Sequence, residues 1–305
     1  MNKDNKDTPP LKFVTYNTHL FYHTAPGFFG EEYEDKERIN GIIDHLRTSG
    51  ADVVGLNEVW ADSTKETFIQ NLRIQFPYSY YNPNKEIFKL GSGLLFLSKY
   101  PIINPSFVKF QELIGWDSMS QKGMITGNII VPSGGTYVPY FFVITHTQAG
   151  GSNDEINVRH DNIDQMWKVI RGLPFGNNPL VVFGDLNVIA ENEGGSITAD
   201  YYYLTSMLGS LGLKDLYRVI HPSAQQDHGY TSDWYTNDLK KIFNPNDKTR
   251  TRLDYFFVKN FDTNNSASST ISVIHNYTYY DPKTSEQMDL SDHFPLIASA
   301  TVVIV

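Results

Sequence analysis

The feature that most constrains this chain is a set of six short polar motifs, each at or just past the end of an apolar run. A soluble domain ordinarily places Val, Ile, Leu and Phe on inner strands and leaves carboxylates outside. Strand ends that meet at one edge of a core are where α/β and α+β domains collect polar groups, so we expect the motifs to converge. They are VTYNTHLF around Asn17, VVGLNEVW around Glu58, FFVITHTQ around His146, LVVFGDLNV around Asp185 and Asn187, RLDYFFV around Asp254, and LSDHFP around Asp292 and His293.

Apolar periodicity predicts alternating strands and helices. Several apolar runs are continuous, which is typical of strands covered on both faces. The order is strand, helix, strand, helix, strands, and then the same again, which predicts two halves whose sheets pack face to face with helices outside. The strand runs are 12–16, 52–56, 93–98, 140–145, 180–184, 254–258, 270–275 and 295–305.

Four helices are expected between these runs. Gly50 is a natural stop for the first, and a capping box of Ser63 and Glu66 starts the second. The residues on their apolar faces are Ile39, Ile42, Ile43 and Leu46; Phe68, Ile69 and Leu72; Val158, Ile163, Met166, Trp167 and Ile170; and Leu204, Leu208 and Leu211. Residues 222–249 read as a long active-site loop, and 260–269 as a mobile turn.

Composition limits the class of protein. The 305 residues allow one large domain, and we expect a polar leader (1–10) followed by a single domain (11–305). The formal net charge of −9 argues against a broad nucleic-acid footprint, and the absence of Cys excludes disulfides and thiolate chemistry. MNKDNKDTPP has no apolar stretch and is no signal peptide, although the chain fits a mature secreted or periplasmic protein as well as a cytoplasmic one.

The carboxylates suggest two kinds of chemistry. Asp185 and Asn187 lie two residues apart, so in extended chain they share a face, where one can accept a proton from water and the other can donate to phosphate. GDLN is also an ordinary strand-to-turn sequence. Glu58 at a buried strand end needs a cationic partner, for which a metal ion is the simplest candidate and a distant Arg the alternative.

The histidines complete this set. Asp292 adjoins His293 but points the other way on an extended chain, so Asp254 is the better candidate to orient the imidazole as a general base. His146 could donate to charge developing on phosphorus. Lys122, followed by Gly123, offers a point charge to phosphate, with a surface turn as the alternative. Serine-hydrolase, dinucleotide, P-loop and zincin motifs are absent.

Together these motifs resemble the endonuclease/exonuclease/phosphatase superfamily and, within it, the bacterial neutral sphingomyelinases. LNEVW, THTQA, the KG at Lys122 and YTSDWYTN before RLDYFFV carry the narrower likeness. The resemblance implies a four-layer α/β sandwich of two packed mixed sheets flanked by helices, as in DNase I. It also implies Mg²⁺-dependent hydrolysis of sphingomyelin to ceramide and phosphocholine, with Mn²⁺, Co²⁺ or Ca²⁺ as alternative ions.

The resemblance further implies a role for each residue. Glu58 ligates the metal, with Asn17 close by and Asp292 in its outer neighbourhood. Asp185 and His293 activate water, Asp254 orients His293, and Asn187, His146 and Lys122 bind the substrate phosphate. The expected partner is a phospholipid at a membrane surface, acted on by a monomer with no stable nucleic-acid partner.

The interval between LDY and SDH departs from the haemolytic members of that group. It contains Tyr279 and Tyr280 but no Trp, and tyrosines suit an interface more than deep insertion. Phe28-Phe29 and Tyr201-Tyr202-Tyr203 are other candidate contacts, with core packing as the alternative. A phosphatase or nuclease acting on a soluble phosphate ester or on nucleic acid therefore stays open.

Overall fold

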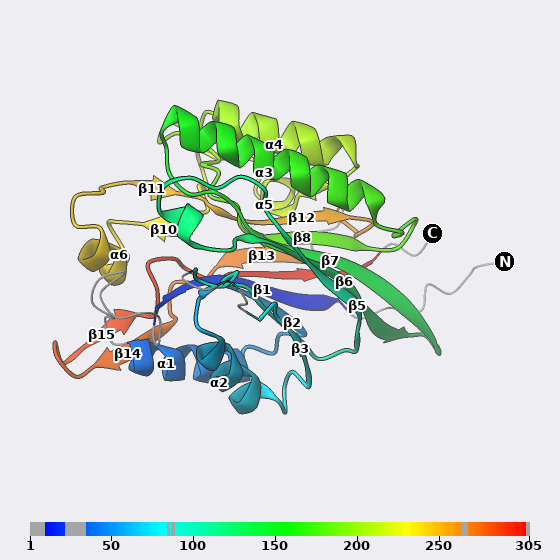
Figure 1. Cartoon of the computed structure of the whole chain (residues 1–305), viewed down its shortest axis with the longest axis horizontal. Coiled ribbons are helices and arrows are strands. Elements are labelled where there is room, and N and C mark those ends of the chain that lie inside the picture. Colours follow the sequence, from blue (N-terminus) through cyan, green and yellow to red (C-terminus); the bar gives the residue numbers. More distant parts are fainter. Residues whose placement is uncertain (1–9, 22–34, 84–85, 87–88, 264–267, 303–305) are drawn as a thin grey trace.

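The computed structural model describes residues 10–21, 35–83, 86, 89–263 and 268–302. Within them, two six-stranded sheets pack face to face, and helices cover the outer face of each (Figure 1). The predicted four-layer α/β sandwich is confirmed. Residues 1–9 of the expected leader (1–10), the Phe28-Phe29 pair and part of the 260–269 turn lie outside the described residues.

The first sheet has the strand order β13-β16-β1-β2-β4-β3. These strands are β13 (Ser269–Val273), β16 (Leu296–Ala300), β1 (Leu11–Leu20), β2 (Val53–Val59), β4 (Leu95–Ser98) and β3 (Tyr78–Tyr80). Its outer face packs against α1 (Asp35–Thr48), α2 (Asp62–Leu72) and a hairpin of β14 (Thr278–Asp281) and β15 (Glu286–Asp289).

The second sheet has the order β5-β6-β7-β8-β12-β9. Its strands are β5 (Ile102–Lys109), β6 (Gly123–Ser133), β7 (Thr136–His146), β8 (Leu180–Asp185), β12 (Asp254–Lys259) and β9 (Lys214–Asp215), and its outer face packs against α3 (Asn153–Gly172) and α4 (Ala199–Ser210). Short elements connect these layers: η1 (Gly115–Met119), α5 (Leu216–Ile220), β10 (Ser232–Asp233), α6 (Asp238–Phe243) and β11 (Arg250–Thr251).

The continuous apolar runs follow from burial of both sheet faces. Phe13 points into the core between the sheets, whereas its neighbour Val14 points toward the outer helices. Between the sheets, Phe96 stacks on Phe142 with ring centroids 3.8 Å apart. Alternate residues therefore serve two different cores, and the carboxylates and imidazoles of the motifs lie toward the strand ends.

Helix ends test the capping predictions. Gly50 has φ 67° just after α1, a conformation glycine adopts without strain, so the predicted stop is confirmed. The capping box at Ser63 is wrong: α2 begins at Asp62 with Ala61 as its N-cap, which has no side-chain acceptor. A reciprocal capping box instead joins Ser152 and Glu155 at the start of α3.

The long loop predicted at 222–249 is only partly irregular, because it contains β10 and α6. Its fold is held by hydrogen bonds rather than an apolar pattern: Asn237 caps α6 through Lys240 N and donates to the Ser291 carbonyl at 2.9 Å. This bond ties α6 to the motif that carries His293. None of the helices described here is both long and apolar enough to cross a bilayer.

Candidate active site

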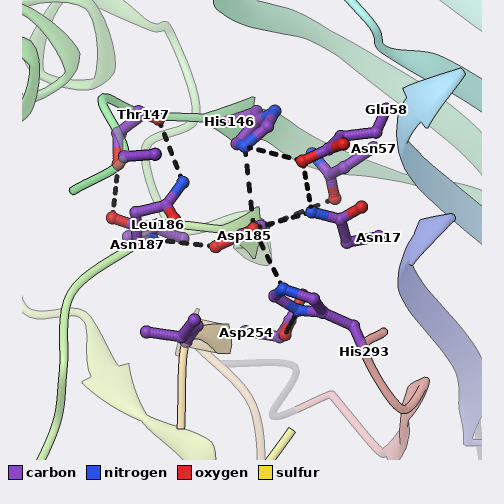
Figure 2. Close-up of polar contacts among 12 residues, drawn as sticks. Asn17, Asn57, Glu58, His146, Thr147, Asp185, Leu186, Asn187, Asp254 and His293 are labelled. Carbon is purple, nitrogen blue, oxygen red and sulfur yellow. Dashed lines mark hydrogen bonds and ion pairs between the residues drawn. The ribbon is translucent and has the colours of Figure 1, made fainter. Parts of the chain in front are cut away.

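Strand pairing sets the predicted residues side by side. His146 on β7 opposes Asp185 on β8, and Asp185 opposes Asp254 on β12. In the facing sheet Asn17 opposes Asn57, which precedes Glu58. The structure thus brings the motifs together at one end of the two sheets, with His293 beside them (Figure 2).

Asn17 links the two sheets. Its Nδ2 donates to Glu58 Oε1 and to Asp185 Oδ2, both at 2.9 Å. Glu58 has φ 59°, a left-handed conformation that costs a non-glycine residue on the order of 1 kcal/mol or more. Burial opposes ionisation of Glu58, but the hydrogen bond with His19 and the charges of His19, His146 and Lys122 hold its pKa well below its usual range.

Asp185 is buried at the centre of the cluster. Its Oδ2 lies 3.6 Å from His146 Nε2 and 3.9 Å from His293 Nε2. Burial and the negative charge of Asp254 raise the pKa of Asp185 to about 7. This carboxyl can therefore take up or release a proton near neutral pH.

Asn187 forms the turn after β8 at φ 51°. Its backbone N–H donates to Asp185 Oδ1 at 2.8 Å, and its Nδ2 donates to the Thr147 carbonyl at 3.1 Å. The GDLN sequence is thus a strand-to-turn structure and part of the cluster at the same time. Asn187 lies within the cluster, as predicted, but its amide is engaged by the chain.

His293 is oriented by Asp254 rather than by its neighbour Asp292. Its Nδ1 lies 2.8 Å from Asp254 Oδ2, which fixes Nδ1–H as donor and turns Nε2 toward Asp185. Burial opposes the charged ring, but Asp254, Asp185 and Asp292 raise the pKa of His293 to about 10. The pKa of His293 is therefore higher than that of a general base poised near neutral pH. Asp185, with a pKa of about 7, is the neighbouring group that titrates in that range.

His146 is a buried imidazole whose Nε2 lies 3.8 Å from Glu58 Oε1. Burial and the charge of Lys122 lower its pKa well below the usual value, so the ring is neutral. Its Nδ1 has no hydrogen-bond partner among the described residues. A neutral ring that faces two carboxylates can donate one N–H or offer one lone pair.

Lys122 lies beside the cluster with only 1% of its surface exposed, so it is not in a surface turn. Its Nζ pairs with Asp117 Oδ1 at 2.8 Å and donates to the Thr147 carbonyl at 3.1 Å. A Cβ on Gly123 would lie 2.3 Å from the Val108 carbonyl oxygen, so close strand pairing requires glycine there. The structure places the lysine near Glu58 and His146, with its charge already shared by Asp117.

Sequence reasoning missed His19. Its Nδ1 lies 3.4 Å from Glu58 Oε2 and 3.6 Å from Asp292 Oδ1. Burial disfavours the charged ring, but Asp292 and Glu58 raise the pKa of His19. The sequence offered a partial signal, since His19 is two residues after Asn17 in the VTYNTHLF motif. A register shift between Asn17 and Leu20 and a φ of 46° at His19 set the direction of the ring, and regular strand alternation does not predict either.

The donor atoms fit a divalent cation. Two groups of atoms, each within 4.8 Å of one another, qualify among the described residues: Glu58, His146 and Asp185, and Asp185, Asp254 and His293. Asp254 Oδ1 is buried without a hydrogen-bond partner in the described chain. Buried carboxylate oxygens in this number suit a hard cation such as Mg²⁺. Asn17, by contrast, meets Glu58 through a hydrogen bond in this structure.

The tyrosines that the sequence suggests as surface contacts differ in how exposed their side chains are. On the β14–β15 hairpin, Tyr280 is 58% exposed whereas Tyr279 is buried. On α4, Tyr202 is 64% exposed and Tyr201 is buried. Each run of adjacent tyrosines therefore offers single exposed rings rather than a continuous apolar surface.

Residues 14–293 match the Endonuclease/Exonuclease/phosphatase family, and the chain belongs to this family. It is accordingly an enzyme of the phosphodiesterase type, with a buried cluster of acids and histidines.

Three relatives narrow the likeness. Sphingomyelinase C of Bacillus cereus is 24% identical over 325 residues, which cover 96% of this chain and 89% of the relative. The crystal structure of sphingomyelinase C from Streptomyces griseocarneus superposes with a TM-score of 0.72 at 24% identity, covering 96% and 99% of the two chains. A doubly substituted beta toxin of Staphylococcus aureus, with bound magnesium ions, gives a TM-score of 0.69 at 20% identity, covering 96% and 100%.

Proposed function

We propose that this enzyme is a magnesium-dependent phosphodiesterase that hydrolyses sphingomyelin to ceramide and phosphocholine. Near-full-length similarity to a protein named sphingomyelinase C supports the substrate, and a relative that holds magnesium supports the metal. The observation that carries the proposal is the contact of Asp254, His293 and Asp185 beside Glu58.

Proton transfer falls to the Asp185 and His293 pair. Asp254 fixes the ring of His293, and the pair accepts the proton that a water molecule loses as it attacks phosphorus. A pKa of about 7 for Asp185 allows this near neutral pH. The same pair can return the proton to the leaving ceramide oxygen.

A metal ion and hydrogen-bond donors on the other side of the cluster would stabilise the negative charge of the phosphate. Glu58, with Asp292 in the outer neighbourhood, would hold the metal, which supplies positive charge to the phosphate oxygens. His146, Asn187 and Lys122 are the donors that we assign to the phosphate. For Asn187 and Lys122 this requires exchange of the bonds to Thr147. Donors of this kind typically contribute about 3 kcal/mol each to lowering the barrier.

The substrate would be met at a membrane surface. Tyr280 at the hairpin is exposed and has the amphipathic ring that suits a membrane interface. A secreted or periplasmic location and a monomeric state belong to the same proposal.

Release of phosphocholine from sphingomyelin vesicles in Mg²⁺ tests the proposal. His293→Ala should abolish release, while His221→Ala, at the end of α5 where the ring faces the Ile271 carbonyl, should preserve it. Parallel assays would use phosphatidylcholine vesicles, plasmid DNA and a soluble phosphate monoester. Turnover of the plasmid or the monoester without turnover of sphingomyelin would reassign the enzyme to the nucleases or phosphatases of its family.

A further inference from the structure

Asn57 is a fully buried polar residue to which the proposed chemistry assigns no role. It lies on β2 directly before Glu58. Asn57 and Asn17 are partners in the parallel pairing of β1 with β2, so their side chains point to the same side of the first sheet. That side faces the second sheet, because the Asn17 amide reaches Asp185 on β8.

The amide of Asn57 bridges the two sheets with both of its polar atoms. Nδ2 donates to the Thr145 carbonyl at 2.8 Å, and Oδ1 accepts a longer hydrogen bond of 3.4 Å from the backbone N–H of Asp185. Thr145 immediately precedes His146 on β7, and Asp185 is the last residue of β8. One side chain of the first sheet is thus bonded to the backbone of the second sheet at the two points that carry His146 and Asp185.

The backbone on the other side of this bridge is held as well. The carbonyl of Asn57 accepts a hydrogen bond of 2.9 Å from Thr18 Oγ1 on β1. The next residue, Glu58, has the left-handed φ of 59°, and such strain persists only where the surroundings hold the backbone in place. Asn57 therefore connects the strand that aims Glu58 to the strands that aim the facing groups.

We propose that Asn57 is a positioning residue whose amide fixes the spacing of the two sheets at the cluster, and with it the affinity of the cluster for a divalent cation. The ligand atoms of Glu58, His146 and Asp185 lie within 4.8 Å of one another, and they come from both sheets. A cation held between the sheets is bound tightly only where their spacing is fixed. Asn17 contacts the carboxylates themselves, whereas Asn57 acts on the backbone behind them.

A purely structural role of this amide predicts a different result. In that case the amide only satisfies two buried backbone groups, and its loss lowers the stability of the protein. Molecules that stay folded would then bind Mg²⁺ as tightly as the wild type. If the amide positions the cluster, the folded molecules themselves bind the ion more weakly.

Asn57→Ala is the test variant, and isothermal titration of the metal-free protein with Mg²⁺ is the measurement. Sucrose in the buffer favours the folded state without replacing the lost hydrogen bonds, and circular dichroism verifies that the sample is folded. We expect the affinity to fall by about tenfold to a hundredfold, the range typical of residues that orient metal ligands. Asn57→Gln keeps the amide but lengthens the side chain by one methylene, so it should fold and still bind Mg²⁺ more weakly than the wild type.

Asn260→Ala is the matched control, because it also removes a hydrogen bond from an amide to a carbonyl. Asn260 Nδ2 donates to the Asn178 carbonyl at 3.0 Å, at the end of β8 and β12 that is remote from the cluster. Its φ of 63° adds strain on substitution, so stability should fall while the affinity for Mg²⁺ stays at the wild-type value. Wild-type affinity in folded Asn57→Ala, or an equal loss of affinity in Asn260→Ala, would overturn the proposal.

The inference rests on the cation of the proposed function but not on its substrate. A wild-type enzyme that binds Mg²⁺ and cleaves a phosphodiester other than sphingomyelin would reject the substrate and leave Asn57 in its role. Cleavage of sphingomyelin by the wild type, together with unchanged Mg²⁺ affinity in folded Asn57→Ala and Asn57→Gln, would keep the function and reject the positioning role.

Discussion

His293 Nδ1 lies 2.8 Å from Asp254 Oδ2, while its Nε2 faces Asp185 Oδ2 at 3.9 Å. The imidazole therefore stands between two carboxylates that neighbouring strands β12 and β8 hold in register. One carboxylate accepts a short hydrogen bond and sets the tautomer. The other lies beyond hydrogen-bonding distance but close enough for its charge to act on the ring.

Asp254→Asn removes the charge that orients His293 but keeps the shape of the side chain. An amide also offers a donor, which permits the wrong tautomer, so we expect kcat to fall by about 10²–10⁴ with little change in KM. Steady-state kinetics on the substrate of the wild-type enzyme measure this, with urea unfolding as the stability control. If the variant is unfolded under the assay conditions to an extent that accounts for all the lost activity, the orienting role is contradicted.

Glu58→Gln tests the metal site through stability rather than turnover. Wild-type protein should gain about 2.7 kcal/mol when the divalent ion is present at a hundredfold excess over its dissociation constant. Thermal unfolding with and without Mg²⁺ measures this gain, which Glu58→Gln should abolish. Asp44→Asn, at an exposed acid of α1, should retain it. An equal Mg²⁺-dependent shift in all three proteins would place the ion elsewhere.

Gly184→Ala tests the close strand pairing that aims Asp185. Gly184 has φ 137°, and a Cβ there would lie 2.0 Å from the Thr145 carbonyl oxygen. We expect a loss on the order of 3 kcal/mol or more in the free energy of unfolding. Gly172→Ala, at the end of α3 where the added Cβ meets nothing within 4 Å, should cost far less. Equal effects of the two changes in urea denaturation would count against the steric explanation.

Asp289 predicts a pH dependence of stability. Burial and the nearby charge of Asp238 raise the pKa of this carboxyl to about 6, above its unfolded value. Folding therefore favours the protonated form: this contribution to stability is fully present below about pH 4 and is lost as the pH rises to about 6. Asp289→Asn should stabilise the protein more at pH 7.5 than at pH 4, by about 1–3 kcal/mol. An identical gain at both pH values, measured by urea unfolding, would contradict the shift.

The sequence predicts the sheets and the cluster because both depend on strong local signals. Continuous apolar runs mark β1, β2, β7, β8 and β12, and polar residues at their ends mark the site. The predicted helix start at Ser63 is wrong because the Ser–Glu spacing falls inside the first turn of α2, whose N-cap is Ala61. The register between β8 and β12, which sets Asp254 opposite Asp185, is a long-range property that no local pattern encodes. The same holds for the contact of Asp254 with His293, which joins the two sheets.

His19 and Lys122 show what local patterns leave open. The ring of His19 packs against Phe243, which lies more than 200 residues later in the chain, so no local pattern predicts its environment. Lys122 carries a charge suited to phosphate, but its pairing with Asp117 depends on the fold of η1. A partner from a distant segment can neutralise the charge of a side chain, and such a partner is known only from the folded structure.

Asn17 holds Glu58 of one layer and Asp185 of the other in a single pair of hydrogen bonds. Because no single sheet contains a complete cluster, a slight parting of the layers on warming will disconnect the reactive groups while every strand is still paired. Activity should therefore be lost at a lower temperature than the far-ultraviolet circular dichroism signal. The temperature at which activity is lost then reports how tightly the two sheets pack against each other.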